Sequence, residues 1–111
     1  MGAIEKYIAD FEVEAGLRGT DLANLTGVSK ATVSRWRNGT AFPHPESERL
    51  ISDLHYLIDR LTDYYSGSEI RTWLYAPHPQ LEGRRAIEVL HEGGLTEILK
   101  TLERMDEAAY L

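Results

Sequence analysis

The chain has 111 residues, 42% of them hydrophobic, which is enough for one folded domain or two very small domains that share a core. It contains no cysteine, which excludes disulfides and thiolate metal sites and favours a reducing, cytoplasmic location, and no apolar run approaches the roughly 20 residues that span a bilayer. The 18 Asp and Glu exceed the 12 Lys and Arg, and the resulting net charge of −6 by itself argues against a nucleic-acid partner.

Three short helices are predicted in the first 39 residues. The first has apolar side chains at the i, i+3, i+4, i+7 spacing of an amphipathic helix: Ile4, Tyr7, Ile8 and Phe11. Thr20 is the expected N-cap of the second helix, which Gly27 is expected to end in a left-handed conformation. Ser29 is the expected N-cap of the third helix, over residues 30–38, which Gly39 ends.

Four further helices are predicted after residue 44. The longest runs from about residue 45 to 65, with an apolar stripe of Leu50, Leu54, Leu57, Ile58, Leu61 and Tyr65. The other three are shorter and separated by glycine or proline: one around Trp73, one over residues 86–91 and one from Leu95. No segment shows the alternation of a strand, so the sequence predicts an all-α fold.

Residues 22–39, LANLTGVSKATVSRWRNG, have the parts of a helix-turn-helix in order. Ala23 is small enough for two helices to cross closely, and Gly27 allows the turn between them. If Val33 and Trp36 pack inward, the outward side chains of the third helix can reach a DNA major groove: Lys30, Thr32, Ser34, Arg35 and Arg37.

The charge is unevenly distributed along the chain. Residues 17–49 carry five bases and three acids, a sum of +2, whereas residues 1–16 sum to −3 and residues 50–111 to −5. Local charge rather than the total attracts phosphate, so the predicted recognition helix lies in the one basic segment. The acidic flanks are expected to keep nonspecific DNA affinity low.

Two segments resemble parts of a known family. LANLTGVSKATVSRWRNGTAFP resembles the helix-turn-helix of the Xre/Cro class, notably of its antitoxin members. The second segment resembles the toxin-binding domain of Xre/MbcA/ParS-type antitoxins through Trp73-Leu74, Pro77, Leu81, Gly83-Arg84-Arg85, Glu88-Val89-Leu90 and Gly93-Gly94. Together the resemblances cover roughly residues 17–104, with departures from the family pattern at His78 and Ala86.

The resemblance implies an antitoxin whose partner is a RES-domain toxin that degrades NAD. Its C-terminal region would obstruct the active-site cleft of the toxin, and the complex would bind its own operator DNA. The DNA-binding residues would be Ser29, Lys30, Thr32, Arg35 and Arg37, with Thr20 and Asn38 near phosphates. The toxin-binding residues would be Trp73, Pro77, Leu81, Arg84, Arg85, Tyr110 and Leu111.

We expect three regions: a helix-turn-helix DNA-binding region over residues 1–48, a connecting helix over 49–66 and a small helical toxin-binding region over 67–111. A homodimer within a larger toxin–antitoxin hetero-oligomer is expected, because one helix-turn-helix makes a weak site and paired copies read two half-sites. Judged on physical grounds alone, Trp73 fits a core position better than a contact, and Arg84-Arg85 could be ordinary solvated charge.

An enzyme is not expected, and neither is a cofactor or a bound metal. The four histidines lie in different segments without the i, i+4 spacing of helical metal ligands: His44, His55, His78 and His91. Two other functions stay open. One is a stand-alone transcriptional repressor whose C-terminal half senses a ligand or partner, and the other is an adaptor whose helix-turn-helix no longer contacts DNA.

Overall fold

Local capping signals set the helix boundaries in the first forty residues of the computed structural model, which describes residues 2–109 except for the side chains of 105, 106, 108 and 109. The Ser29 hydroxyl oxygen accepts a hydrogen bond from the Thr32 N–H at 3.1 Å, as predicted for an N-cap. Gly27 and Gly39 both have φ of 75°, the left-handed conformation in which glycine ends a helix without strain.

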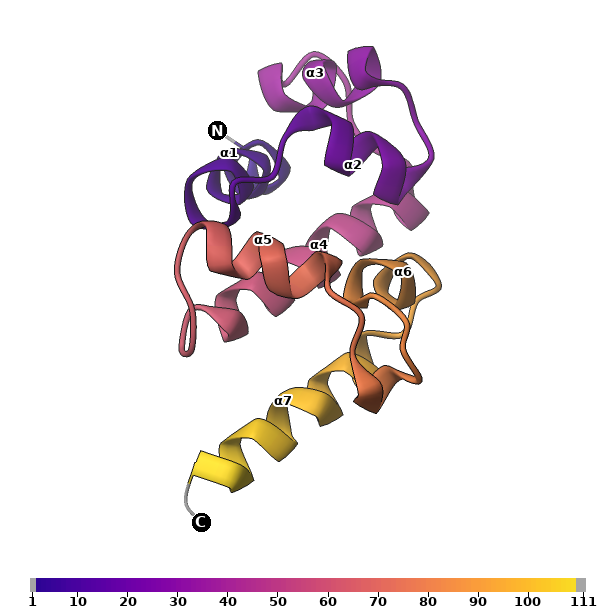
Figure 1. Cartoon of the computed structure of the whole chain (residues 1–111). Coiled ribbons are helices and arrows are strands. Elements are labelled where there is room, and N and C mark those ends of the chain that lie inside the picture. The colour runs from indigo at the N-terminus through magenta and orange to yellow at the C-terminus, as the bar shows by residue number, and fades with distance from the viewer. Residues whose placement is uncertain (1, 110–111) are drawn as a thin grey trace.

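All the secondary-structure elements of the described residues are helices, which confirms the all-α prediction (Figure 1). In chain order they are α1 (Ala3–Ala15), α2 (Gly19–Thr26), α3 (Lys30–Asn38), α4 (Pro45–Leu61), α5 (Ser68–Tyr75), the short 3-10 helix η1 (Pro79–Leu81), α6 (Ala86–His91) and α7 (Leu95–Ala109). Within this part of the chain the extended pairing is limited to one isolated bridge, between Pro77 and Arg85.

The predicted N-cap of α2 was wrong. The helix begins at Gly19, so Arg18 occupies the N-cap position and Thr20 lies exposed in the first turn. The Asp21 carboxylate accepts the Arg18 N–H at 2.7 Å and so satisfies one of the free N–H groups at this helix end. A carboxylate is a stronger acceptor than a hydroxyl and is favoured by the helix dipole, so Asp21 determines the start of α2.

Helix α4 ends four residues before the predicted position. It ends at Leu61, whose carbonyl accepts hydrogen bonds from the N–H groups of both Tyr64 and Tyr65. The bond from Tyr64 spans three residues rather than the four of an α-helix, so the chain tightens into a turn after Leu61. Tyr65 is nevertheless partly buried against the core, which explains why the apolar pattern continues past the end of the helix.

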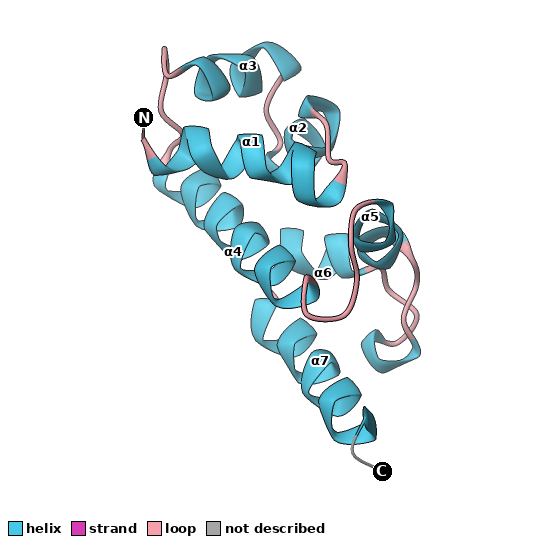
Figure 2. Ribbon diagram, turned by 90° about the vertical axis from the view of Figure 1, so that its left-hand side faces the viewer, coloured by secondary structure: helices cyan, strands magenta, loops and turns pink. Residues whose placement is uncertain are grey.

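Helix α4 joins the two halves of the molecule. It packs against α1 and α2 on one side and against α6 and α7 on the other (Figure 2). Its buried face consists of Leu50, Ile51, Leu54, Leu57, Ile58 and Leu61. One hydrophobic core therefore includes side chains from the first helix, such as Phe11, to the last, such as Leu102. The regions predicted over residues 1–48, 49–66 and 67–111 therefore share one core. The boundaries between them stay a prediction.

The molecule is elongated, with principal extents of 49 × 23 × 20 Å. Helix α3 lies at one end, and α7 extends as an arm toward the other, as Figures 1 and 2 both show. No helix in residues 2–109 combines the length and apolar character that crossing a membrane requires.

Candidate functional site

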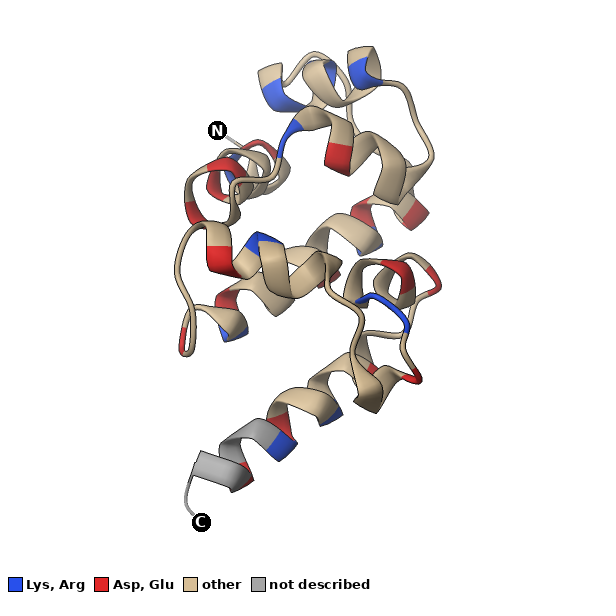
Figure 3. Ribbon diagram, in the orientation of Figure 1, with Lys and Arg blue, Asp and Glu red and all other residues tan. Residues whose placement is uncertain are grey.

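The outer side of α3 presents the predicted DNA-binding side chains. Val33 and Trp36 are buried on the inner side of the helix, which packs against α1 and α2. Lys30, Arg35 and Arg37 are exposed, and Figure 3 shows basic residues toward both ends of α3. The structure thus places these three bases together on one exposed helix, although contact with DNA stays a prediction.

The bases of α3 are held loosely. Within residues 2–109, none of Lys30, Arg35 and Arg37 takes part in an ion pair with a carboxylate. The one side-chain hydrogen bond among them runs from Arg35 Nη1 to Thr32 Oγ1 at 3.5 Å. These cations therefore remain hydrated and available to phosphate oxygens.

Sequence reasoning did not assign a role to Arg18. Arg18 is exposed at the N-cap of α2, directly before Gly19 and Thr20. Arg37 reaches the same place from α3, because a Cβ added to Gly19 would lie 3.8 Å from Arg37 Nη2. The Arg37 guanidinium thus lies at the start of α2, where Arg18 is the exposed N-cap residue. The basic charge of residues 17–49 indicated such a cluster, but the sequence alone did not show which bases meet.

The predicted toxin-binding residues lie at different depths. Leu81 is fully buried in the core and Trp73 is 8% exposed, whereas Pro77 is exposed and Arg84 and Arg85 lie at the surface. Leu81 therefore supports this surface from beneath, and its direct contact with a partner would need a rearrangement. Tyr110 and Leu111 lie outside the described residues.

Arg84 connects three elements of the C-terminal half. Its Nε donates a hydrogen bond to the Leu81 carbonyl of η1 at 2.9 Å. Its Nη atoms form ion pairs with Glu92, which follows α6, and with Glu97 on α7. These partners orient the guanidinium, and the side chain is one-third exposed, so it still reaches the surface.

Arg85 is similarly restrained. Its Nε donates to the Glu88 carboxylate one turn along α6. The centre of its guanidinium lies 5.7 Å from the ring centroid of Tyr75. Nearly half of the side chain is exposed. Both predicted toxin-binding arginines are thus held in defined directions at the surface.

Asp21 accepts hydrogen bonds from two distant parts of the chain, a set of contacts that we call the Asp21 network. Besides the Arg18 N–H, its carboxylate accepts Arg71 Nη1 at 2.7 Å, Arg71 Nη2 at 3.1 Å and the Tyr75 hydroxyl at 2.6 Å. The network joins α2 to α5. Sequence reasoning missed the network because Arg71 and Tyr75 lie 50 and 54 residues from Asp21 along the chain.

The charges of the Asp21 network are mutually stabilising. Burial by itself raises the pKa of Asp21, but hydrogen bonds from Arg71, the Arg18 N–H and Tyr75 outweigh it and hold the pKa below the usual 3.8. Burial and the hydrogen bond to Asp21 raise the pKa of Tyr75 to about 12. The hydrogen bond to Asp21 raises the pKa of Arg71. The carboxylate is therefore ionised and the phenol protonated near neutral pH.

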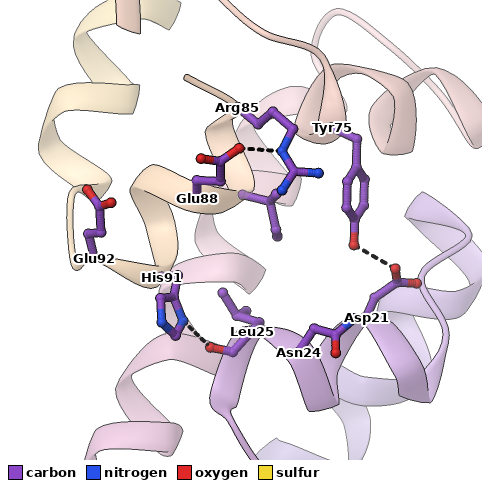
Figure 4. A pocket seen from close by; sticks show the side chains of 9 residues that line it. Asp21, Asn24, Leu25, Tyr75, Arg85, Glu88, His91 and Glu92 are labelled. Atoms are coloured by element: carbon purple, nitrogen blue, oxygen red, sulfur yellow. Dashed lines mark hydrogen bonds and ion pairs between the residues drawn. The ribbon is translucent and has the colours of Figure 1, made fainter. Parts of the chain in front are cut away.

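A polar cleft of about 390 Å³ separates α2 from α5 and α6 (Figure 4). Two hydrogen bonds cross it: Tyr75 donates to Asp21, and His91 Nδ1 donates to the Leu25 carbonyl at 2.6 Å. Arg85 and Glu88, which form an ion pair, also line the cleft. The side chains that bridge the cleft bond to other groups of the protein. Polar contacts therefore hold its two sides together.

A second pocket, of about 340 Å³, lies beside α5. Tyr65, Trp73 and His78 are among its lining residues, and the rings of Trp73 and His78 are 4.4 Å apart. His78 Nε2 also donates to the Trp73 carbonyl at 2.8 Å. Trp73 is therefore both a core residue and part of a pocket wall.

His55, His78 and His91 each contact other residues of the described chain. His55 stacks on Tyr7 with ring centroids 3.8 Å apart and lies 3.6 Å from Asp10. Among the side chains that the structure describes, no group of three or more His, Asp or Glu residues is arranged to hold a metal ion.

Comparison with known proteins bears on both halves of the chain. Residues 60–107 match the sequence model of a family described as the antitoxin Xre/MbcA/ParS C-terminal toxin-binding domain. The chain is 23% identical over 110 residues to the mycobacterial cidal antitoxin MbcA of Mycobacterium bovis and of Mycobacterium tuberculosis, covering 99% of this chain and 90% of each relative. The resemblance of the second segment to the toxin-binding domain of these antitoxins is confirmed.

The fold is similar to one solved by crystallography. A chain in the crystal structure of the M. tuberculosis MbcT–MbcA toxin–antitoxin complex matches with a TM-score of 0.85 and 19% sequence identity, over 100% of both chains. At that identity the match shows that the two chains share an all-α fold, including the arrangement of α1 to α4 that precedes the matched domain.

Proposed function

We propose that this chain, an antitoxin of the Xre/MbcA/ParS type, binds a RES-domain toxin that degrades NAD and occludes its active-site cleft. The observation that carries the proposal is the match of residues 60–107 to the toxin-binding family. That segment includes the oriented arginines Arg84 and Arg85, Pro77 at the surface and most of α7. The RES-type, NAD-degrading partner follows from the resemblance of residues 73–94 to antitoxins of such pairs.

The geometry of the C-terminal half suits a protein interface. Arginine is enriched at interface anchors because its planar guanidinium can bond a carboxylate in two places. Arg84 and Arg85 already have a fixed direction in the free chain, so less conformational entropy is lost when a partner binds them. The C-terminal tail, which follows the extended α7, would be the segment that enters the cleft of the toxin.

We also propose that the antitoxin represses its own operon through α2 and α3. The unpaired bases of α3, together with Arg18 at the N-cap of α2, would contact the operator. Because α3 and the end of α7 lie at opposite ends of a 49 Å molecule, one chain could bind DNA and toxin at the same time. A homodimer within the complex would place two copies of α3 on paired half-sites.

Co-expression with the adjacent reading frame tests the antitoxin function. The neighbour expressed alone should stop growth and deplete cellular NAD, and this chain should restore both. A neighbour that is harmless alone, or growth arrest without loss of NAD, would contradict the proposal of a NAD-degrading partner.

Operator binding tests the second part. Binding to the promoter fragment should be stronger for the toxin–antitoxin complex than for the free antitoxin, because assembly pairs the weak single sites. Equal binding with and without toxin would favour the stand-alone repressor, and no binding in either state would favour the adaptor.

A further inference from the structure

Asp21 belongs to α2, within the region predicted to bind DNA, yet three of its four hydrogen bonds come from α5. Arg71 contributes two donors and Tyr75 one. Asp21 is only 8% exposed, and it lies on the cleft-facing side of α2. Its side chain thus faces the toxin-binding half of the molecule.

Tyr75 links Asp21 to a predicted toxin contact. The hydroxyl of Tyr75 donates to Asp21 Oδ1 at 2.6 Å, while its ring lies beneath the guanidinium of Arg85. Figure 4 shows the ring between the Asp21 carboxylate and the Arg85 side chain at the edge of the cleft. The hydrogen bond to Asp21 and the Arg71 guanidinium, 4.9 Å from the ring centroid, hold the ring, and the ring in turn offers one neighbouring surface to Arg85.

Arg85 has two restraints on a side chain that is otherwise nearly half exposed. Glu88 holds the Nε side of the guanidinium, and the ring of Tyr75 lies against the group. Without a fixed ring, Glu88 would be the remaining restraint on this guanidinium in the described part of the chain. More rotamers would then be open to Arg85, and binding a partner would cost more entropy.

We propose that Asp21 is a positioning residue for the toxin-binding surface, acting through the Tyr75 hydroxyl to orient Arg85. The proposal rests on the proposed antitoxin function. It assigns part of α2 to toxin binding, although α2 lies outside the matched residues 60–107. Because Asp21 is ionised and Tyr75 protonated near neutral pH, the hydrogen bond persists under physiological conditions.

The test compares two tyrosines that lose the same atom. Tyr75→Phe removes the hydroxyl that bonds Asp21, and Tyr56→Phe removes one from a tyrosine that is half exposed on α4. Each full-length variant is titrated with the toxin encoded by the adjacent reading frame, and Kd is measured by calorimetry. Tyr75→Phe should weaken binding about three- to tenfold, the range expected for one lost hydrogen bond and a freed arginine, with Tyr56→Phe within twofold of the parent.

A double-mutant cycle separates positioning from a general loss of structure. In an Arg85→Ala background, Tyr75→Phe should have no further effect, because the group that it positions is absent. Asp21→Asn, which keeps one acceptor oxygen but loses the charge, should weaken binding in the parent and not in the Arg85→Ala chain. Circular dichroism of every variant checks that the helices are retained.

The inference is overturned if Tyr75→Phe changes Kd no more than Tyr56→Phe does. It is also overturned if Tyr75→Phe raises Kd by the same factor in the parent and in the Arg85→Ala chain, or if Arg85→Ala itself leaves Kd unchanged. In each of these cases the parent still neutralises the toxin, so the antitoxin function stands. Failure of the parent to bind the toxin would overturn both the function and the inference.

Discussion

The basic side chains of α3 and the two arginines at residues 84–85 are held in different ways. Lys30, Arg35 and Arg37 are exposed without ion pairs in the described chain, whereas Arg84 and Arg85 are paired with glutamates on α6, on α7 and just after α6. The difference follows from the charge of each segment. Residues 17–49 sum to +2, whereas residues 50–111, which sum to −5, supply the glutamates that pair with Arg84 and Arg85.

The two arrangements suit two kinds of partner. A DNA backbone presents many equivalent phosphates, so hydrated and mobile cations can adjust to it. A folded protein surface presents particular groups at fixed positions, so a side chain that is already oriented loses less entropy on binding. The contrast between loosely held and restrained bases therefore supports the assignment of DNA to one end and a protein partner to the other.

The largest expected effect comes from weakening α4, the helix against which both halves of the molecule pack. Leu57→Ala should lower the free energy of unfolding by about 2–5 kcal/mol, because Leu57 is fully buried on the helix that joins the halves. Urea unfolding followed by circular dichroism and by tryptophan fluorescence should give one transition, since Trp36 and Trp73 report on different halves of one core. Val13→Ala, at a residue 81% exposed, is the matched control and should change stability by less than about 0.5 kcal/mol. Two separate transitions would show that the ends fold independently.

The second prediction concerns the end formed by α3, which is proposed to bind DNA. Replacing Arg35 and Arg37 together by alanine should weaken operator binding on the order of 100-fold and reduce its salt dependence, because base and phosphate contacts are both lost. Toxin affinity should stay within twofold of the parent. The control replaces Lys100 and Arg104, two exposed bases of α7, and so removes the same charge from the other end. Equal losses in the two double variants would mean that total charge, rather than α3, binds DNA.

The third prediction concerns the toxin end. Deleting residues 106–111 should weaken toxin binding about 30-fold, if the tail enters the cleft as an interface anchor. Operator binding by the truncated chain should remain near that of the parent, measured by fluorescence anisotropy on the same DNA fragment. Full neutralisation by the truncated chain would assign the blocking to the surface around Arg84 and Arg85 instead.

The smallest expected effect concerns the link between the ends. Because the pKa of Asp21 in the folded protein is below 3.8, the ionised carboxylate stabilises the fold above that pH, and this contribution is lost as the pH falls through the folded pKa. Asp21→Asn should lower the free energy of unfolding by about 1–3 kcal/mol at neutral pH and by progressively less in acid. Urea titrations across the acid range check this, with exposed Asp59→Asn as the control. A constant difference at every pH would mean that Asp21 acts without its charge.

The sequence by itself determined the fold class and most helix boundaries. Ser29 and the glycines that end α2 and α3 act through hydrogen bonds to neighbouring residues, and apolar spacing marked the buried faces of α4 and α7. These signals need only a few residues of chain, so they can be read without the tertiary structure. The family resemblance was also visible, because its motif residues lie close together along the chain.

Only the tertiary structure decided which charges meet. It showed that Leu81 is core, that Arg37 reaches the start of α2, and that Arg84 is paired across three elements. It also joined Asp21 to Tyr75, 54 residues away, through a hydrogen bond that no local pattern encodes. Such contacts depend on how α2 and α5 pack around the shared core, because side chains far apart in sequence become neighbours only after their helices have docked.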